Sequence, residues 1–152
     1  MQIRPLSFRA LADRSHREQI RQALLAAQLA FPYWQRAFPE AEYQAPLVEA
    51  IKIVESFLAS GILPANAKAV AEAAYRAVSG CDLPPGDIHR SSGFSVAHVA
   101  MTPWLHASGS LQKVTHNSQV SIGYSESIHR WAGRLPELEA ALLSSAPGLP
   151  DA

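Results

Sequence analysis

Two neighbouring stretches, PLVEAIKIVESFLASG (residues 46–61) and PANAKAVAEAAYRAVSG (residues 64–80), decide the fold. Each begins with a proline and ends with a glycine, which are the residues that favour the first turn and the end of a helix. Only Ile62 and Leu63 lie between them, so the two helices should be antiparallel neighbours. The apolar residues of each stretch recur at helical spacing, with charged residues on the opposite side. The sequence therefore predicts a helical hairpin in the middle of the chain.

The composition of the whole chain fits one globular domain. It has 152 residues, 48% of them hydrophobic and 17% charged, which is enough to bury an ordinary core. Thirteen basic residues balance thirteen acidic ones, so the chain lacks the positive charge that general nucleic-acid binding requires. We expect no nucleic-acid partner.

The sequence also indicates where the protein works. The first residues, MQIRPLSFRALADRSHREQ, lack the continuous apolar segment of a signal peptide, and no stretch has the length of a membrane span. The single cysteine, Cys81, excludes an internal disulfide and suits a reducing compartment. We expect a cytoplasmic protein without a membrane partner.

A first helix is predicted to begin near Ser15, because Ser15 and Glu18 have the spacing of a capping box. Pro32 should kink or restart this helix. Its apolar stripe comprises Ile20, Ala23, Leu24, Ala27 and Phe31. Leu25 and Leu29 lie on roughly the opposite side, so the helix is either enclosed in the core or buries its second face against another chain. A homodimer through this first helix stays open.

A loop is predicted over residues 79–92, because Pro84-Pro85-Gly86 can continue neither a helix nor a strand. A fourth helix should then start at Ser91 or Ser92. One side of this helix carries Phe94, Ala97, His98 and Met101. Thr102-Pro103 should interrupt it, either as a kink or as the start of a new helix capped by Thr102.

The segment that follows allows two interpretations. A helical stripe ending at Gly133 comprises Val120, Tyr124, Ser127, Ile128 and Trp131. Residues 111–122 nevertheless alternate, and Asn117-Ser118 could turn a small β-hairpin. We favour the helix, because the alternation is lost from Glu126 onward while the helical stripe persists.

These elements together predict an all-α fold. We expect a single helical domain over residues 1–144, built as a bundle of five to seven helices, with a small β-hairpin near 111–122 as the alternative in that segment. A short last helix should cover residues 136–143, and residues 145–152 should form a disordered tail.

The sequence offers no recognisable catalytic or metal-binding constellation. Five histidines fall in the C-terminal half: His89, His98, His106, His116 and His129. Their spacing is too wide for ligands on neighbouring helical turns, and no HExxH motif occurs. Cys81 lies beside Asp82, whose charge opposes a thiolate, and no GxSxG, P-loop or GxGxxG motif is present. We predict no enzyme, metal or cofactor, although an enzyme that uses histidines brought together by folding stays open.

The three tryptophans, Trp34, Trp104 and Trp131, are the other conspicuous residues. Each could be a core anchor whose indole N–H finds an acceptor. Each could equally be an interface hot spot, where tryptophan, tyrosine and arginine concentrate. The sequence leaves both interpretations open.

Three stretches in the first two-thirds of the chain resemble one known family. Residues 12–41 have a DHR-like start and an aromatic-rich end before a proline. Residues 44–61 are similar to an RPRxAIxxxxxWxxG segment, with Phe57 at the place of the usual tryptophan. Residues 91–110 resemble a small-residue helix with an Ala-His and a later His-Ala dipeptide. These features resemble the all-α immunity proteins of bacterial polymorphic-toxin systems, of the Imm-five-like family.

The resemblance implies a protein that binds a cognate bacterial toxin and neutralises it by direct contact, with no catalytic residues to carry over. Such a protein needs a rigid, preformed surface rather than an active site. We expect partner contacts in the loop 81–90 and in an acidic turn before the helical hairpin. The candidate partner-binding residues are Asp82, Asp87, His89, Arg90, Glu40 and Glu42. The alternatives are that these loops are solvated connectors, and that the chain is a helical adaptor or homo-oligomeric module with no toxin partner.

Overall fold

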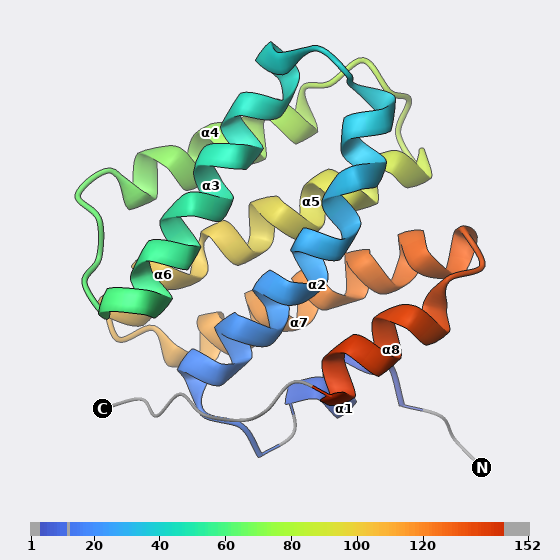
Figure 1. The fold of residues 1–152 in the computed structure, drawn as a ribbon. Coiled ribbons are helices and arrows are strands. Elements are labelled where there is room, and N and C mark those ends of the chain that lie inside the picture. Colours follow the sequence, from blue (N-terminus) through green and yellow to red (C-terminus); the bar gives the residue numbers. More distant parts are fainter. Residues whose placement is uncertain (1–3, 12, 145–152) are drawn as a thin grey trace.

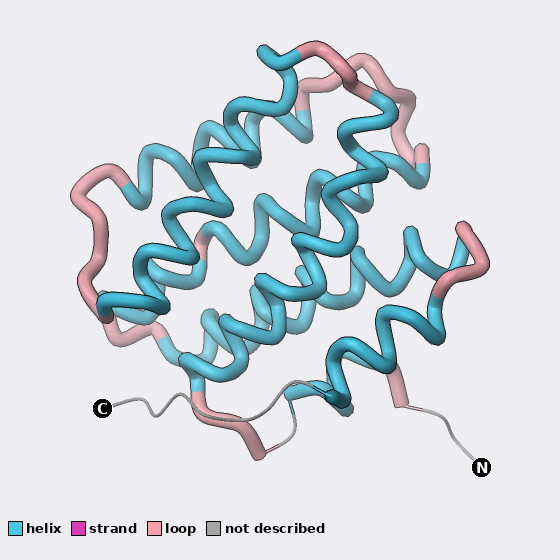
Figure 2. Tube along the Cα trace, viewed as in Figure 1, coloured by secondary structure: helices cyan, strands magenta, loops and turns pink. Residues whose placement is uncertain are grey.

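The computed structural model describes residues 4–11 and 13–144, and in these residues it contains helices and loops but no strand (Figure 2). The two short helices, of six residues each, are α1 (Leu6–Leu11) and α6 (Thr102–Ala107). The longer helices are α2 (His16–Ala37), α3 (Ala41–Ser60), α4 (Ala67–Ser79), α5 (Ile88–Ala100), α7 (Leu111–Trp131) and α8 (Leu135–Ser144). The predicted all-α bundle is therefore confirmed. The predicted disordered tail, residues 145–152, lies outside the described residues.

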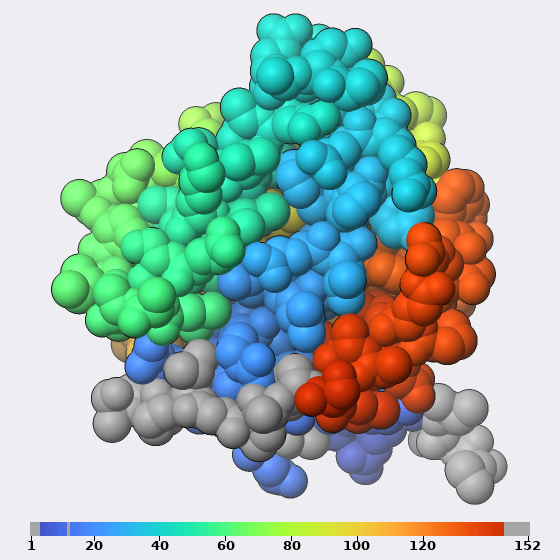
Figure 3. Space-filling view, viewed as in Figure 1, coloured from blue at the N-terminus to red at the C-terminus, as the bar shows by residue number. Residues whose placement is uncertain are grey.

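The longer helices lie in two layers (Figure 1). The front layer holds α2, α3 and α8, and the rear layer holds α4, α5 and α7. Within the rear layer α5 contacts both α4 and α7, whereas α4 and α7 do not contact each other. From the front layer α2 and α3 also contact α5, and the space-filling view shows the front helices closing over it (Figure 3). Helix α5 is thus the centre of the bundle.

Small side chains join α2, α5 and α7. Their buried small residues are Ala23, Ala26, Ala27 and Ala30 on α2, Ser92, Gly93, Ser95, Ala97 and Ala100 on α5, and Ser118, Ser121 and Ser125 on α7. The Oγ of Ser95 donates to the Ser121 carbonyl oxygen at 2.8 Å, and the Oγ of Ser121 donates to the Ser95 carbonyl oxygen at 2.6 Å. The Oγ of Ser125 donates to the carbonyl oxygen of Ala26 at 2.7 Å. We call Ser95, Ser121 and Ser125 the serine seam, because their hydroxyls are satisfied by the backbone of a neighbouring helix.

The predicted helical hairpin is present, with boundaries that differ from the expectation. Gly61 ends α3 in the left-handed region, with a φ of 73°, as a terminal glycine should. Pro46, however, lies inside α3, and Pro64 lies in the connection before α4. The connection therefore covers residues 61–66 rather than two residues. Gly80 follows α4 with a φ of −96°, so this position does not need glycine for its backbone angle.

The N-terminal part holds one helix more than the sequence predicted. The capping prediction is confirmed, because the Ser15 Oγ accepts the backbone N–H of Glu18 at 3.1 Å and α2 begins directly afterwards. Pro32 lies inside α2, which continues to Ala37. The preceding helix α1 was not predicted. Of the two leucines on the second face of α2, Leu25 is partly buried against the core, and Leu29 is 36% exposed.

In the second half, one prediction was wrong and one favoured interpretation is confirmed. The loop predicted over residues 79–92 is shorter, because Asp87 caps α5 and the helix begins at Ile88 rather than at Ser91 or Ser92. The helix favoured for residues 111–122 is confirmed, since this segment belongs to the continuous helix α7, and the alternative, a small β-hairpin, does not form. The alternation there was misleading because α7 buries serines, so its polar residues face the core. Residues 102–107 form a new helix, with Thr102 as its first residue instead of its cap.

Candidate functional site

The side of α5 that faces away from the front layer carries larger side chains than its core side. From Ser91 to the end of α5, only Ser91, Phe94 and His98 are partly exposed, and Met101 continues the row after the helix ends. Their spacing of three, four and three residues places them on one stripe of the helix. Helices α4 and α7 flank this stripe without contacting each other. We call the resulting depression the α5 groove: Phe94, His98 and Met101 at its floor, with side chains of α4 and α7 at its sides.

Aromatic rings fill much of the α5 groove. The ring of Tyr124 on α7 stacks on Phe94 with a centroid separation of 5.3 Å, and on His98 with a separation of 5.6 Å. From α4, the Tyr75 ring meets His98 nearly perpendicularly, at 5.9 Å and 83°. These distances fall within the range of attractive aromatic pairs. Tyr75 is nonetheless 44% exposed, so the aromatic cluster reaches the protein surface.

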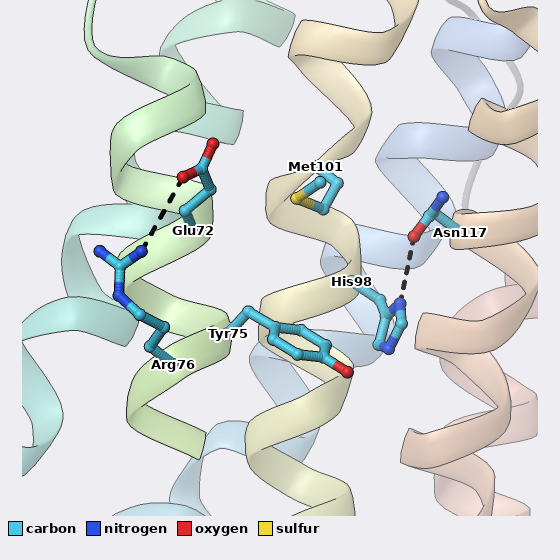
Figure 4. Close-up of a pocket in the computed structure, with 6 residues that line it drawn as sticks. All are labelled: Glu72, Tyr75, Arg76, His98, Met101 and Asn117. Carbon is cyan, nitrogen blue, oxygen red and sulfur yellow. Dashed lines mark hydrogen bonds and ion pairs between the residues drawn. The ribbon is translucent and has the colours of Figure 1, made fainter. Parts of the chain in front are cut away.

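A pocket of about 320 Å³ opens in the part of the α5 groove near the end of α5 (Figure 4). Its lining residues are Glu72, Tyr75, Arg76, His98, Met101 and Asn117. Figure 4 shows the side chains of Tyr75 and His98 close together, with Met101 above them and Asn117 beside the histidine. Glu72 and Arg76 form an exposed ion pair at 3.8 Å, so the charges of these two residues offset each other at the edge of the pocket.

Hydrogen bonds and burial both act on His98. The Nδ1 atom of His98 lies 3.1 Å from the Oδ1 atom of Asn117. Burial is the largest influence on this imidazole and lowers its pKa below the usual value. The hydrogen bond to Asn117 acts against this, while the electrostatic interaction with His116 acts in the same direction as burial. The balance favours a neutral ring at neutral pH.

Three predicted partner-binding residues lie where α5 begins. The Asp87 carboxylate caps α5 by accepting the backbone N–H of His89 at 2.8 Å, and this hydrogen bond is the main cause of the lowered pKa of Asp87. Arg90 donates to the carbonyl oxygen of Ser79 at 2.8 Å, and its guanidinium lies 5.7 Å from the Phe94 ring centroid. The His89 Nδ1 lies 3.0 Å from the Asp87 Oδ1, so all three side chains have intramolecular roles at this end of the α5 groove.

Two of the other predicted residues line one pocket beside α4. Glu42 and Asp82 line a second pocket of about 310 Å³, together with Tyr43 and Arg76 among others. We call this the acidic pocket. Arg76 lines both pockets, so the acidic pocket and the α5 groove are adjacent. Glu40 is the exposed residue before α3 and makes no capping hydrogen bond with its side chain.

The tryptophans divide between the two interpretations. Trp34 is buried, and its indole N–H donates to the carbonyl oxygen of Tyr43 at 3.1 Å, as expected of a core anchor. Trp131 is 59% exposed, and its ring meets the edge of the His89 ring at 5.2 Å. Trp104 is half-buried, with the ammonium of Lys68 4.8 Å from its ring centroid.

The histidines do not assemble into a metal site in the part of the chain that the structure describes. No three His, Cys, Asp or Glu side chains of residues 4–11 and 13–144 come together in a geometry that could hold a metal ion. Of the five C-terminal histidines, His98 is the one that lines the pocket of the α5 groove.

Sequence reasoning missed Tyr75, Tyr124 and Asn117 as members of a site, although it placed Phe94, His98 and Met101 on one side of a helix. The helical spacing of Phe94, His98 and Met101 was the signal that they share one side of α5. The spacing could not show which side of α5 faces the core, because the buried side is made of serine, glycine, alanine and valine.

Comparison of the chain with protein-family models, with curated proteins and with solved structures found no match. Among the described residues, no helix combines the length and the apolar character that crossing a bilayer would need.

Proposed function

We propose that this chain is a cytoplasmic binding protein that neutralises a cognate bacterial toxin by direct contact, as the resemblance to Imm-five-like immunity proteins implies. The observation that carries the proposal is the outward stripe of α5, which presents Phe94, His98 and Met101 in a groove at the surface. Contiguous exposed aromatic side chains with a polar rim are characteristic of protein interaction sites.

The α5 groove has the preformed character that tight binding favours. Apart from Phe94 and His98, every residue of α5 from Ser92 to Ala100 is buried. The stacked rings of Phe94, His98 and Tyr124 also restrict one another. A surface that is already ordered loses little conformational entropy when a partner docks. This supports binding by a fixed face rather than by a loop that folds on contact.

The charges beside the groove indicate the chemistry of the partner. Glu42 and Asp82 lie in the acidic pocket and Glu40 lies exposed nearby in the sequence, while Arg76 is paired with Glu72. A partner that fits this surface would place an apolar or aromatic side chain in the α5 groove and a basic group at the acidic pocket. The predicted residues Glu40, Glu42 and Asp82 keep their proposed role as charged contacts at the rim.

The test uses the protein encoded next to this chain in its genome. That neighbour is expressed alone and together with this chain, and growth is measured; the two proteins are then mixed and examined by size-exclusion chromatography with light scattering. We expect the neighbour to be toxic alone, growth to be restored by this chain, and a 1:1 complex to form. Absence of both protection and complex would refute the proposal.

A second candidate is a homo-oligomeric module that associates through α2. The observation in its favour is Leu29, which is 36% exposed on a helix whose other sides are buried. Leu25 gives less support, since it packs partly against the core of its own chain. Light scattering of the chain alone measures its oligomeric state. A dimer that Leu29→Glu dissociates would support this candidate. A monomer at high protein concentration would refute it.

A further inference from the structure

The pocket of the α5 groove holds a hydrogen-bond acceptor whose position is fixed by its neighbours. The Nδ2 of Asn117 donates to the carbonyl oxygen of Lys113 at 2.9 Å, which turns its Oδ1 toward His98. Because an amide oxygen can only accept, the proton of the neutral imidazole must lie on Nδ1 of His98. Its Nε2 is therefore an acceptor, beside the ring of Tyr75 (Figure 4).

The remaining walls of the pocket suit a planar aromatic group. Tyr75 offers a ring that is nearly perpendicular to that of His98, and the Met101 thioether is a polarisable neighbour of the kind that contacts aromatic rings favourably. A volume of about 320 Å³ lies near the lower end of the roughly 300–1,000 Å³ range of ligand pockets. One small ring system is the size of ligand to expect.

The polar groups of the pocket further restrict which aromatic ligand fits it. A cationic ligand finds no unpaired counter-ion among the lining residues, because Glu72 is paired with Arg76. A phenyl ring would leave the acceptor of His98 without a donor, and a phenol would bring acceptor lone pairs of its own. An indole N–H is a donor only, which matches the fixed acceptor of His98 between the Tyr75 ring and the Met101 thioether.

We propose that this pocket receives an indole ring from a tryptophan side chain of the partner protein, with the indole N–H donating to Nε2 of His98. This inference rests on the proposed function, since it names the group that the toxin would insert into the α5 groove. Tryptophan is also the residue type most typical of anchors that fill a pocket at a protein interface.

The test needs no partner protein. The isotopically labelled chain is titrated by NMR with N-acetyl-L-tryptophanamide, with its 1-methyl derivative, which lacks the N–H, and with N-acetyl-L-phenylalaninamide. We expect the first probe to shift the signals of Tyr75, His98 and Asn117 most. Loss of the N–H should weaken binding about fivefold or more, as expected when one hydrogen bond is removed. The phenylalanine probe should bind no better than the methylated one.

Variants test the acceptor directly. Asn117→Leu removes the group that fixes the His98 tautomer and should weaken the tryptophan probe severalfold, whereas the exposed His116→Gln, one residue earlier on α7, should leave binding unchanged. If Asn117→Leu does not fold, His98→Phe serves instead, because it keeps an aromatic ring and removes the acceptor. Equal binding of the methylated probe, or shifts centred on another face, would overturn the inference.

Binding of free indole without binding of the tryptophan amide would also overturn the proposed indole pocket, because a tryptophan side chain could then not reach it. The two proposals can fail separately. Toxin protection without probe binding would refute the indole pocket alone. Probe binding without toxin protection would refute the proposed function, and the pocket would keep its ligand chemistry.

Discussion

The close approach of the helices limits which side chains fit at single positions in the core. Gly93 lies on the buried side of α5, and a Cβ added there would lie 2.7 Å from a ring carbon of Trp34 and 2.8 Å from a methyl carbon of Val78. These neighbours belong to the core, so they have little room to move. Glycine is required at this position for space rather than for backbone angle.

The first prediction follows from this contact. Gly93→Ala should destabilise the protein by about 1–3 kcal/mol, the usual cost of overpacking, measured by urea denaturation. Gly123→Ala is the matched control on α7, where an added Cβ meets nothing within 4 Å. It should be neutral or stabilise by up to about 1 kcal/mol through helix propensity. Similar effects of the two substitutions would contradict the packing described for α5.

Two histidines make stability depend on pH. Burial is the main reason why the pKa values of His98 and His129 lie below the usual value. The unfolded chain therefore binds protons below about pH 6.5 that the folded protein does not yet bind. The free energy of unfolding should fall as the pH drops below that value, and should level off once the pH lies below the pKa values of the folded state.

Denaturation at a series of pH values between 7.5 and 5 measures this fall. His98→Phe should reduce its slope, because one of the two sites no longer takes up a proton on unfolding. His116→Gln provides the comparison: that side chain is exposed and acts on His98 only through its charge, so the slope should change less than in His98→Phe. An unchanged slope in His98→Phe would show that the buried imidazole does not contribute.

At the scale of elements, capping and terminal glycines were the predictable features. Ser15 marked the start of α2 and Gly61 the end of α3, because both act through local backbone geometry. Pro46 and Pro64 misled the prediction of helix starts, since proline can also stand in a helix or in the turn before it. The sequence could not show which neighbouring helix each helix face packs against. In α5 and α7 serines face the core, whereas a hydrophobic pattern assigns the core to the larger apolar residues.

At the scale of elements, we predict that a substitution in the serine seam lowers the stability of the protein. Ser121→Val removes a hydroxyl that bonds to the Ser95 backbone and adds a methyl group between α5 and α7. Together these changes should cost about 2–4 kcal/mol, from one buried hydrogen bond and from overpacking. Ser127→Val is the matched control, because that hydroxyl bonds within its own helix and is partly exposed.

The control substitution should change the free energy of unfolding by about 0.5 kcal/mol or less, as is usual away from the core. Both substitutions lie on α7 and carry the same change in helix propensity, so their difference isolates the contact between helices. If both variants had the same stability, the seam would not hold α5 against α7.

For the whole molecule, the two-layer arrangement explains why the site was only partly predictable. Glu42 and Asp82 lie far apart in the sequence, and the fold brings them to one pocket beside α4. Asp87, His89 and Arg90 were expected in a loop, but the fold uses them to begin α5 and to join it to its neighbours. The α5 groove itself needs three helices to be placed side by side, which no local pattern encodes.

We propose that the α5 groove is the surface that binds the partner. Tyr75 is 44% exposed on α4 at the groove, and Phe8 is 45% exposed on α1, a helix that does not contact α4 or α5. Alanine at either position removes an aromatic ring of almost equal exposure, so general effects of the substitution are matched.

The most direct measurement is therefore the affinity of the neighbour-encoded toxin for the Tyr75→Ala and Phe8→Ala variants, determined by calorimetry beside the unsubstituted chain. We expect Tyr75→Ala to weaken the complex by about 30-fold or more, which corresponds to a hot-spot loss of about 2 kcal/mol. Phe8→Ala should bind as tightly as the unsubstituted chain. Unchanged affinity in Tyr75→Ala, with its fold intact, would show that the α5 groove does not bind the toxin.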